Sequence, residues 1–166
     1  MKCLIFSDSH NYSRHIYSAI RLHKDAEIVF FLGDGLSDID EVRYSFPNVK
    51  ILAVRGNCDM RMFALDEIVQ KTAEIEILGK RIVYTHGDLY GAKYGTGGLE
   101  KLARDKNADI VLFGHTHTTE MKYVSEYERP FYLFNPGSIG SGQGSYGIMT
   151  LTDGKEPLFS HGNFLY

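Results

Sequence analysis

The stretch Ile28-Val29-Phe30-Phe31-Leu32-Gly33-Asp34 joins five consecutive apolar residues to a glycine and a carboxylate. An uninterrupted apolar run with β-branched and aromatic residues is typical of a β-strand that is buried on both faces. Strands of this kind occur in parallel sheets that are covered on both sides by other layers. The stretch therefore predicts a central strand at residues 28–32 that ends in a polar turn.

Two similar runs, at residues 3–6 and 49–54, flank this strand along the chain. The segments between the three runs have the spacing of amphipathic helices, so the order predicts a parallel sheet with crossover helices. Gly79 marks a hairpin turn, and beyond Asp109 we expect an antiparallel second half, which gives a mixed α/β sandwich. The further strands are expected at residues 75–78, 81–85, 109–113, 121–124, 131–134, 148–151 and 158–159.

Three helices are predicted from apolar spacing and capping residues. The first follows Asn11 or Ser13, either of which is a suitable N-cap. The second is expected to begin at Ser37, because Ser37 and Asp40 resemble a capping box. The third covers about residues 96–106, with its leucines on one face.

Polar side chains follow five of the predicted strands, each beside a glycine or serine. In chain order they are Asp8, His10, Asp34, Asn57, His86, His115 and His117. Ligands of open α/β sheets bind beyond the carboxyl ends of the strands, so these side chains converge if the strands are neighbours. Each motif alone is weak, because Gly-Asp is more often a turn and His-x-His is often an exposed pair. All five in this order are a specific signal.

Two aspartates, four histidines and one asparagine offer oxygen and imidazole nitrogen donors, which suit Mn, Fe, Ni, Co or Zn. Seven donors are too many for one four-coordinate zinc ion, and two ions that share a carboxylate are the economical solution. Such a pair clamps the oxygens of a displacement at phosphorus. Its residual positive charge favours binding of phosphate oxygens.

The composition excludes several other classes. A net charge of −3 without a run of Lys or Arg argues against a protein that coats long nucleic acids. No apolar run approaches the ~20 residues of a membrane span, and the first residues lack the apolar core of a signal peptide. The two cysteines form no CxxC pair, which fits a reducing compartment. We therefore expect a soluble cytoplasmic protein without a membrane partner.

We expect no catalytic role for the remaining cysteine, histidines and aromatic residues. Cys3 is expected in the core, and the histidines without a predicted role are His15, His23 and His161. Aromatic residues at 123–127 and 131–132 are predicted to pack in the core or to form a homodimer or tetramer surface.

The motifs match a family pattern. Asp8-Ser9-His10, Gly33-Asp34, Gly56-Asn57, His86-Gly87 and Gly114-His115-Thr116-His117 resemble the motifs of the calcineurin-like metallophosphoesterases. Chain length, Gly56-Asn57-Cys58-Asp59 and Asn135-Pro136-Gly137-Ser138 are similar to its small prokaryotic phosphodiesterase branch, which also resembles the retromer subunit of this fold. The resemblance extends from Met1 to about Leu151.

The resemblance implies a four-layer α/β/β/α sandwich of two mixed β-sheets flanked by helices, which we expect to be a single domain over residues 1–166. It implies hydrolysis of a phosphoester by a metal-bridging hydroxide that attacks in line. We expect two divalent ions, with Mn preferred and Ni, Zn, Fe or Co as alternatives. The first ion is expected on Asp8, His10 and His117 and the second on Asn57, His86 and His115, with Asp34 bridging both.

Cys58 departs from the family pattern, because many members have a histidine after this asparagine. A thiol donates hydrogen bonds weakly, whereas an imidazolium is a charge partner for a phosphate dianion. We therefore predict a preference for diesters over monoesters; the alternative is that Cys58 only fills space. The predicted catalytic residues are Asp34, Asn57, Cys58 and His86, and the predicted substrate-binding residues are Asn57, Cys58 and Arg61. Arg55 is interpreted as a surface charge.

Three other functions compete with a phosphodiesterase. A phosphomonoesterase or small-nucleotide phosphatase would use the same donors. A protein-binding scaffold on the same fold would have empty or single metal sites. A nuclease for long DNA or RNA would need basic patches that the sequence lacks.

Overall fold

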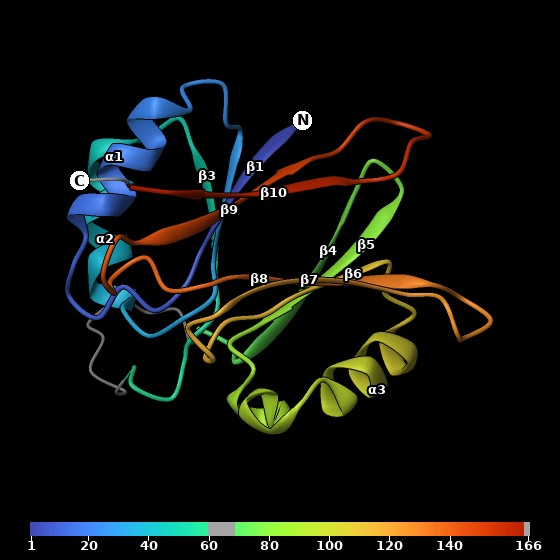
Figure 1. The fold of residues 1–166 in the computed structure, drawn as a ribbon. Coiled ribbons are helices and arrows are strands. Elements are labelled where there is room, and N and C mark those ends of the chain that lie inside the picture. Colours follow the sequence, from blue (N-terminus) through green and yellow to red (C-terminus); the bar gives the residue numbers. More distant parts are fainter. Residues whose placement is uncertain (60–68, 165–166) are drawn as a thin grey trace.

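The structure, a computed structural model, describes residues 1–59 and 69–164, and these form two facing β-sheets (Figure 1). The strands of the first sheet are β1 (Lys2–Phe6), β2 (Ile28–Phe31), β3 (Lys50–Ala53), β9 (Ser145–Thr150) and β10 (Leu158–Asn163). They lie in the order β10-β9-β1-β2-β3. The helices α1 (Arg14–Leu22) and α2 (Leu36–Ser45) cover the outer face of this sheet (Figure 1).

The second sheet has the same number of strands and one covering helix. Its strands are β4 (Thr72–Ile77), β5 (Lys80–Thr85), β6 (Ile110–Leu112), β7 (Thr119–Val124) and β8 (Phe131–Pro136). They lie in the order β4-β5-β6-β8-β7. Helix α3 (Gly97–Lys106) covers its outer face, and the short 3-10 helices η1 (Asp88–Tyr90) and η2 (Ala92–Tyr94) precede α3 (Figure 1). The predicted four-layer sandwich is thereby confirmed.

Side chains that point alternately to the two faces of each strand produce the layers. In β1, Cys3 and Ile5 point into the core between the two sheets, while Leu4 and Phe6 pack beneath α1 and α2. All four side chains are fully buried. In β6, Val111 belongs instead to a third core beneath α3. Burial on both faces is the reason why these strands read as continuous apolar runs.

Strand direction agrees with the prediction in the first sheet and differs in the second. β1, β2 and β3 are parallel, as expected, and Leu78 with Gly79 forms the two-residue hairpin turn between β4 and β5. The expected antiparallel second half is wrong for β6, which is parallel to both β5 and β8. The cause is the crossover through α3 before β6 and the reversal of β7 before β8, which returns the chain to the direction of β6.

Helix α2 begins differently from the prediction. It starts at Leu36 with Gly35 as N-cap, and no capping side chain from its own first turn satisfies the backbone. The predicted capping box of Ser37 and Asp40 is therefore wrong. The backbone N–H groups of Gly35 and Leu36 donate instead to the carboxylate of Asp59, at 2.8 and 3.0 Å.

The residues without a predicted role are structural. Cys3 is buried in the core between the sheets. His15 Nδ1 lies 2.9 Å from the carbonyl of Ile139, and His23 Nε2 lies 3.0 Å from the hydroxyl of Tyr146. His161 Nε2 donates to a backbone carbonyl of β8 at 2.8 Å.

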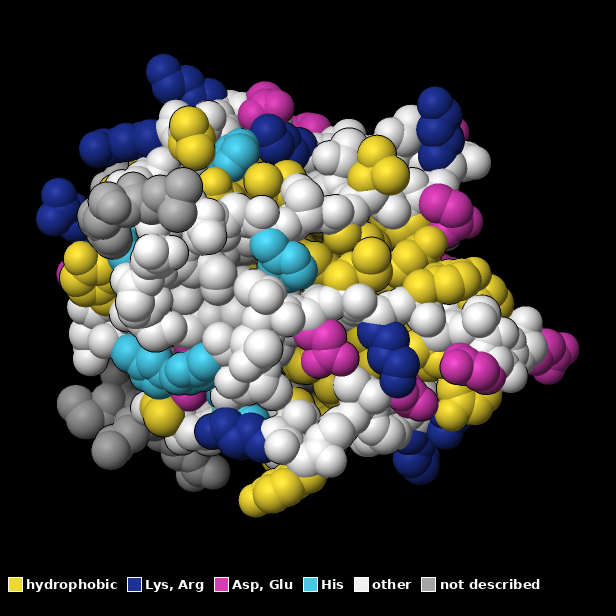
Figure 2. Space-filling model, viewed as in Figure 1, with side chains coloured by type: hydrophobic (Ala, Val, Ile, Leu, Met, Phe, Trp, Pro, Cys, Tyr) yellow, Lys and Arg dark blue, Asp and Glu magenta, His cyan; other side chains and the backbone are white. Residues whose placement is uncertain are grey.

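The aromatic residues of the second half divide between core and surface. Phe131 is buried beneath α3, whereas Tyr123 is 51% and Tyr127 is 37% exposed. Tyr123, Tyr132 and Phe159 form a series of ring contacts at 4.7 and 5.4 Å. Figure 2 shows a broad hydrophobic area on this face, between β10 and the β7–β8 pair. A homodimer or tetramer through these residues stays a prediction.

Among the described residues, each helix is too short or too polar to cross a membrane.

Helix α3 is tied to β7 by one carboxylate that receives three donors. Glu100 accepts from Thr96 Oγ1 at 2.8 Å, from Lys122 Nζ at 2.7 Å and from the Tyr127 hydroxyl at 3.3 Å. The hydrogen bond from Lys122 is the main reason why the pKa of Glu100 is lowered.

Replacing Glu100 by Gln is expected to destabilise the fold by up to about 1 kcal/mol at neutral pH, because the pair is partly solvated. A carboxylate with a lowered folded pKa stabilises the fold above its unfolded pKa, and this contribution disappears as the pH falls through the folded pKa. Urea unfolding between pH 7 and pH 3 should therefore show the two proteins converging at the acidic end. Glu41→Gln, on the exposed face of α2, is the control. A constant difference at every pH would contradict the assignment.

Candidate metal centre

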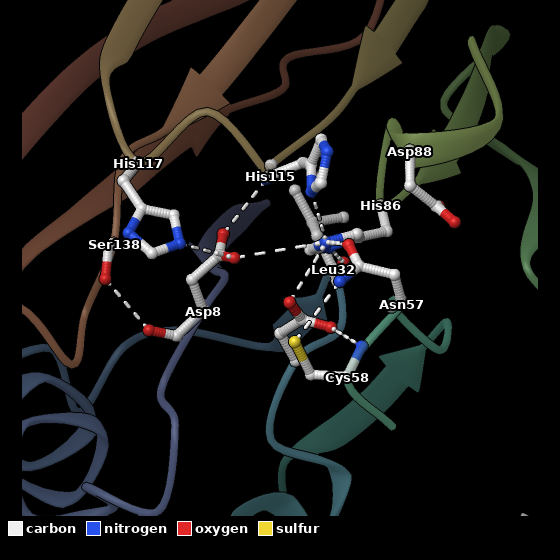
Figure 3. A network of polar contacts seen from close by, with 12 residues as sticks. Asp8, Leu32, Asn57, Cys58, His86, Asp88, His115, His117 and Ser138 are labelled. Atoms are coloured by element: carbon white, nitrogen blue, oxygen red, sulfur yellow. Dashed lines mark hydrogen bonds and ion pairs between the residues drawn. The ribbon is translucent and has the colours of Figure 1, made fainter. Parts of the chain in front are cut away.

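The seven predicted side chains converge at one edge of the sandwich. They come from the loops that follow β1, β2, β3, β5 and β6, which end side by side at that edge (Figure 1). Figure 3 shows Asp8 between His117 and His86, with Asn57 and His115 directed toward the same space. The predicted convergence of these loops is therefore present in the fold.

One side of the cluster is formed by Asp8, His10 and His117. His117 Nε2 lies 3.1 Å from Asp8 Oδ1, and His10 Nε2 lies 3.3 Å from His117 Nε2. The carboxylate of Asp8 is fully buried, whereas both imidazoles are exposed to solvent. A ligand at this point would be held from beneath by a carboxylate and from outside by two ring nitrogens.

The other side is centred on His86. Its Nδ1 lies 2.8 Å from the carbonyl of Leu32, so this nitrogen carries the proton and donates. Its Nε2 faces three further groups: Asn57 Oδ1 at 3.1 Å, His115 Nδ1 at 3.1 Å and Asp34 Oδ2 at 3.3 Å. The bond to the backbone fixes the tautomer and points the lone pair of Nε2 into the cluster, which is typical of a metal-binding histidine.

The charges of the cluster change the pKa values of its members. Burial acts to raise the pKa of Asp34, but His86 and the backbone N–H of Cys58 outweigh it and lower that pKa. Burial acts to lower the pKa of His86, but Asp34 and Asp8 outweigh it and raise that pKa. The pKa of His115 is lowered by burial and by the charges of His86 and Lys93. The cluster thus attracts a positive charge at His86.

One buried carboxylate oxygen is evidence that this site binds a cation. Asp8 Oδ1 is buried and accepts no hydrogen bond from the described residues, although three imidazoles lie within 4.0 Å of it. A buried carboxylate oxygen without a donor is costly unless a positive charge compensates it. The oxygen and nitrogen donors around it are those that first-row divalent ions prefer, so the residues present fit the expected ions.

Three overlapping groups have donor atoms within 4.8 Å of one another: Asp8 with His10 and His117, Asp8 with Asp34 and His86, and His10 with Asp34 and Cys58. The groups overlap, because Asp8, Asp34 and His10 each belong to two of them. Asp8 and Asp34 are thus the two carboxylates that are shared between groups.

Most of the donors occupy a strained backbone conformation. Positive φ angles occur at Asp8 (57°), His10 (47°), Asp34 (59°), His115 (69°) and His117 (60°). Residues with side chains pay energy to adopt this region, and such strain concentrates at functional sites. Two glycines allow the close packing, because an added Cβ at Gly56 would collide with Asp34 and one at Gly114 with Ser7.

Sequence reasoning gave no role to Asp59, which organises the loops. Its carboxylate accepts four backbone N–H groups: Asp34 at 2.8 Å, Gly35 at 2.8 Å, Leu36 at 3.0 Å and Gly56 at 2.7 Å. It therefore joins the loop after β2 to the loop after β3. Its only signal in the sequence is its place in Gly56-Asn57-Cys58-Asp59.

Asn135 has a similar role for the loop after β6. Its Nδ2 donates to the carbonyl of Gly114 and to Thr116 Oγ1, both at 3.0 Å, and its Oδ1 accepts from the N–H of Gly137 at 2.9 Å. Ser138 Oγ donates to the carbonyl of Asp8 at 2.9 Å. Two residues of the Asn-Pro-Gly-Ser motif thus hold the backbone of the loops that carry Asp8, His115 and His117.

The sequence predicts Arg61 as a substrate-binding residue and Arg55 as a surface charge. Arg61 lies outside the described residues. Arg55 is half-buried rather than a free surface charge, and its backbone N–H donates to the carbonyl of Gln70 at 3.0 Å.

A cluster of carboxylates and imidazoles at one edge of a four-layer sandwich is typical of metal-dependent hydrolases. The chain belongs to the calcineurin-like phosphoesterase superfamily, whose domain it matches over residues 1–154.

The similarity to individual relatives supports this family assignment. The chain is 32% identical over 156 residues to the probable metallophosphoesterase YsnB of Bacillus subtilis, covering 91% of this chain and 85% of the relative. It is 28% identical over 148 residues to the phosphodiesterase MJ0936 of Methanocaldococcus jannaschii, covering 82% and 83%. The solved structure of Vacuolar Protein Sorting 29 from Cryptosporidium parvum shares the fold, with a TM-score of 0.74 at 18% identity over 98% of this chain and 97% of that one.

Replacing Asp59 by Asn should lower the free energy of unfolding by about 2–3 kcal/mol, because an amide cannot accept from all four donors and leaves buried N–H groups unpaired. Urea unfolding of the metal-free protein measures the change. The control is Asp40→Asn, which removes only a partly exposed contact of 3.7 Å to Arg43 and should cost no more than about 0.5 kcal/mol. Equal losses in both variants would show that Asp59 does not organise the loops.

Proposed function

We propose that the chain is a phosphodiesterase that depends on two divalent metal ions and acts on small-molecule substrates. The observation that carries this proposal is the overlap of donor groups through the shared carboxylates Asp8 and Asp34. The phosphodiesterase name of one relative supports the substrate class. We also propose that residues 1–166 act as a single metallophosphoesterase domain.

The proposal assigns a set of donors to each ion. Asp8, His10 and His117 hold one ion, Asn57, His86 and His115 hold the other, and Asp34 is shared between them. When bound, the ions would supply a nucleophile by lowering the pKa of water and would polarise the phosphoryl oxygens. Mn is the preferred ion, with Ni, Zn, Fe or Co as alternatives.

The chain's own residues orient the site. His86 is held by the carbonyl of Leu32 and keeps its Nε2 directed at the cluster. Asp34 is held by the backbone N–H of Cys58, which donates to its Oδ1 at 2.7 Å. Both contacts restrict the donors before any substrate arrives, which is the preorganisation that catalysis requires.

Asn57 and Cys58 lie on the open side of the cluster, where a substrate would approach. Both are exposed, and Asn57 Nδ2 lies 3.2 Å from Cys58 Sγ. In the proposal the amide of Asn57 binds a phosphoryl oxygen, and the thiol of Cys58 lies beside the leaving group. Arg61 stays a predicted substrate contact outside the described residues.

The proposed preference for diesters over monoesters rests on Cys58. The hydrogen bond to Asp34, burial and the neighbouring carboxylates raise the pKa of the Cys58 thiol to about 11. A neutral thiol supplies neither positive charge for a phosphate dianion nor efficient protonation of a poor leaving group. Monoesters, which carry the additional negative charge, should therefore react more slowly than diesters with a phenolate leaving group.

Replacing Asp34 by Asn should reduce hydrolysis of an aryl phosphodiester by at least about 100-fold, because the shared carboxylate is lost. The assay uses purified protein with added Mn, and chelation of the wild type should abolish turnover. Asp40→Asn, on the outer helix α2, is the control and should retain turnover. Metal-independent turnover would overturn the proposal. Absent turnover with fewer than two bound ions per chain would favour a protein-binding scaffold.

Replacing Cys58 by His should raise the ratio of aryl monoester to aryl diester hydrolysis by roughly tenfold or more, because an imidazolium supplies charge and a proton. The measurement compares kcat/KM for both substrates in the two proteins. Cys58→Ser, which restores no charge, should leave the ratio near that of the wild type. An unchanged ratio in Cys58→His would mean that Cys58 only fills space.

The cytoplasmic location and a homodimer or tetramer stay predictions. Static light scattering during size-exclusion chromatography measures the oligomeric state directly.

A further inference from the structure

A third donor group lies at the exposed side of the site. His10, Asp34 and Cys58 each place one donor atom within 4.8 Å of those of the other two. His10 and Asp34 already belong to the expected set of ligands, whereas Cys58 was assigned to the substrate side. The question is whether the sulfur of Cys58 has a second role toward metal ions.

The position of the sulfur supports such a role. The backbone N–H of Cys58 donates to Asp34 Oδ1 at 2.7 Å, which fixes the residue against the shared carboxylate. The side chain itself is exposed, so its Sγ is not confined by packing. Figure 3 shows the sulfur of Cys58 on the same side of the cluster as Asn57, and it lies within 4.8 Å of a carboxylate oxygen of Asp34.

A second observation points to a cation here. The buried Asp8 Oδ1 faces the cluster and has no hydrogen bond from the described residues. His10 connects this oxygen to the third group, because its Nε2 lies 3.9 Å from Asp8 Oδ1. His10 therefore lies between the buried oxygen of Asp8 and the group that contains Cys58.

Divalent ions differ in how readily they accept a sulfur ligand. Thiolate is a soft ligand that suits Zn and Co, whereas Mn prefers carboxylate and other oxygen donors. Zinc bonds of about 2.3 Å to sulfur and about 2.0 Å to nitrogen require donors a few ångströms apart. The 4.8 Å limit of this group is compatible with that spacing after rotation of the exposed side chains.

We propose that Cys58 is a conditional metal ligand, which binds thiophilic divalent ions together with His10 and Asp34 and leaves Mn unbound by sulfur. The S–H bond breaks, a bond between sulfur and the ion forms, and the proton passes to solvent. This inference rests on the metal site of the proposed function. It implies that Cys58 adds to the zinc affinity beyond the general order in which protein sites already bind zinc more tightly than manganese.

A thiophilic ion in this group would compete with the arrangement that manganese uses. It would take His10 and Asp34, which are also donors in the other two groups, and it would draw Cys58 away from the substrate side. Zinc is therefore expected to displace manganese and to inhibit the manganese-loaded enzyme.

The test uses Co²⁺ as a spectroscopic probe on the protein of residues 1–166 after removal of metals. A sulfur ligand gives an intense ligand-to-metal charge-transfer band in the near ultraviolet, which oxygen and nitrogen ligands do not give. The wild type should show this band, and Cys58→Ser should lack it. Cys3→Ala controls for the other thiol, which is buried in the core and should not contribute to the band.

Zinc affinity, measured by competition with a chromogenic chelator, supplies a second readout. Cys58→Ser should weaken zinc binding by at least roughly tenfold, while manganese binding changes little. Cys58→His should recover zinc affinity through a nitrogen donor without recovering the charge-transfer band. Circular dichroism of each variant confirms that the fold is retained, as expected for an exposed residue.

The absence of the band in the wild type, or equal zinc affinity in the wild type and Cys58→Ser, would overturn this inference. Neither measurement uses a substrate. A protein that hydrolyses diesters with manganese but lacks the band would contradict only the role of Cys58. A protein that shows the band but no metal-dependent hydrolysis would contradict only the proposed function.

Discussion

The site depends on the carboxylate of Asp59, which is not itself one of the candidate metal ligands. Asp59 gathers backbone N–H groups from the loop after β2 and from the loop after β3. These two loops carry Asp34 and Asn57, and the carboxylate of Asp59 connects them directly. The same carboxylate replaces the missing cap of α2 and places negative charge at the N-terminus of that helix, where the helix dipole favours it. One charge thereby stabilises a helix and sets the spacing of two donors.

The strained backbone of the donors is held by bonds that cross between loops. The N–H of Asp8 donates to the carbonyl of Gly33, and the N–H of His10 donates to the carbonyl of Asp34. The N–H of Gly114 donates to the carbonyl of His86 in the same manner. The positive φ angles of Asp8 and His10 are therefore supported by hydrogen bonds to the loop after β2. A single isolated loop of this sequence would not keep the geometry.

The limits of sequence-based prediction follow from where the stabilising contacts lie. The strands at 3–6 and 28–32 were predictable because both faces are buried, which leaves a continuous apolar run. The cap of α2 was not, because its acceptor lies beyond β3 rather than in the first turn of the helix. Strand β9 begins at Ser145, earlier than predicted, because pairing with β1 and β10 overrides the low strand preference of its small residues. The convergence of donors was predictable from strand ends, whereas the supporting role of Asn135 was not.

The site also joins the two sheets. The carboxylates Asp8 and Asp34 follow strands of the first sheet, whereas His86 follows a strand of the second. The layers meet just before these residues, where the ring of Phe30 packs edge-on against that of Tyr84 at 5.3 Å. This contact is part of the core that packs the two sheets against each other. An ion bound across the seam would in turn hold the sheets together, because a ligand that binds only the folded state adds its binding free energy to the stability of the fold. With an ion bound there, the stability of the inner core and the affinity for the ion would be linked, so that loss of either would weaken the other.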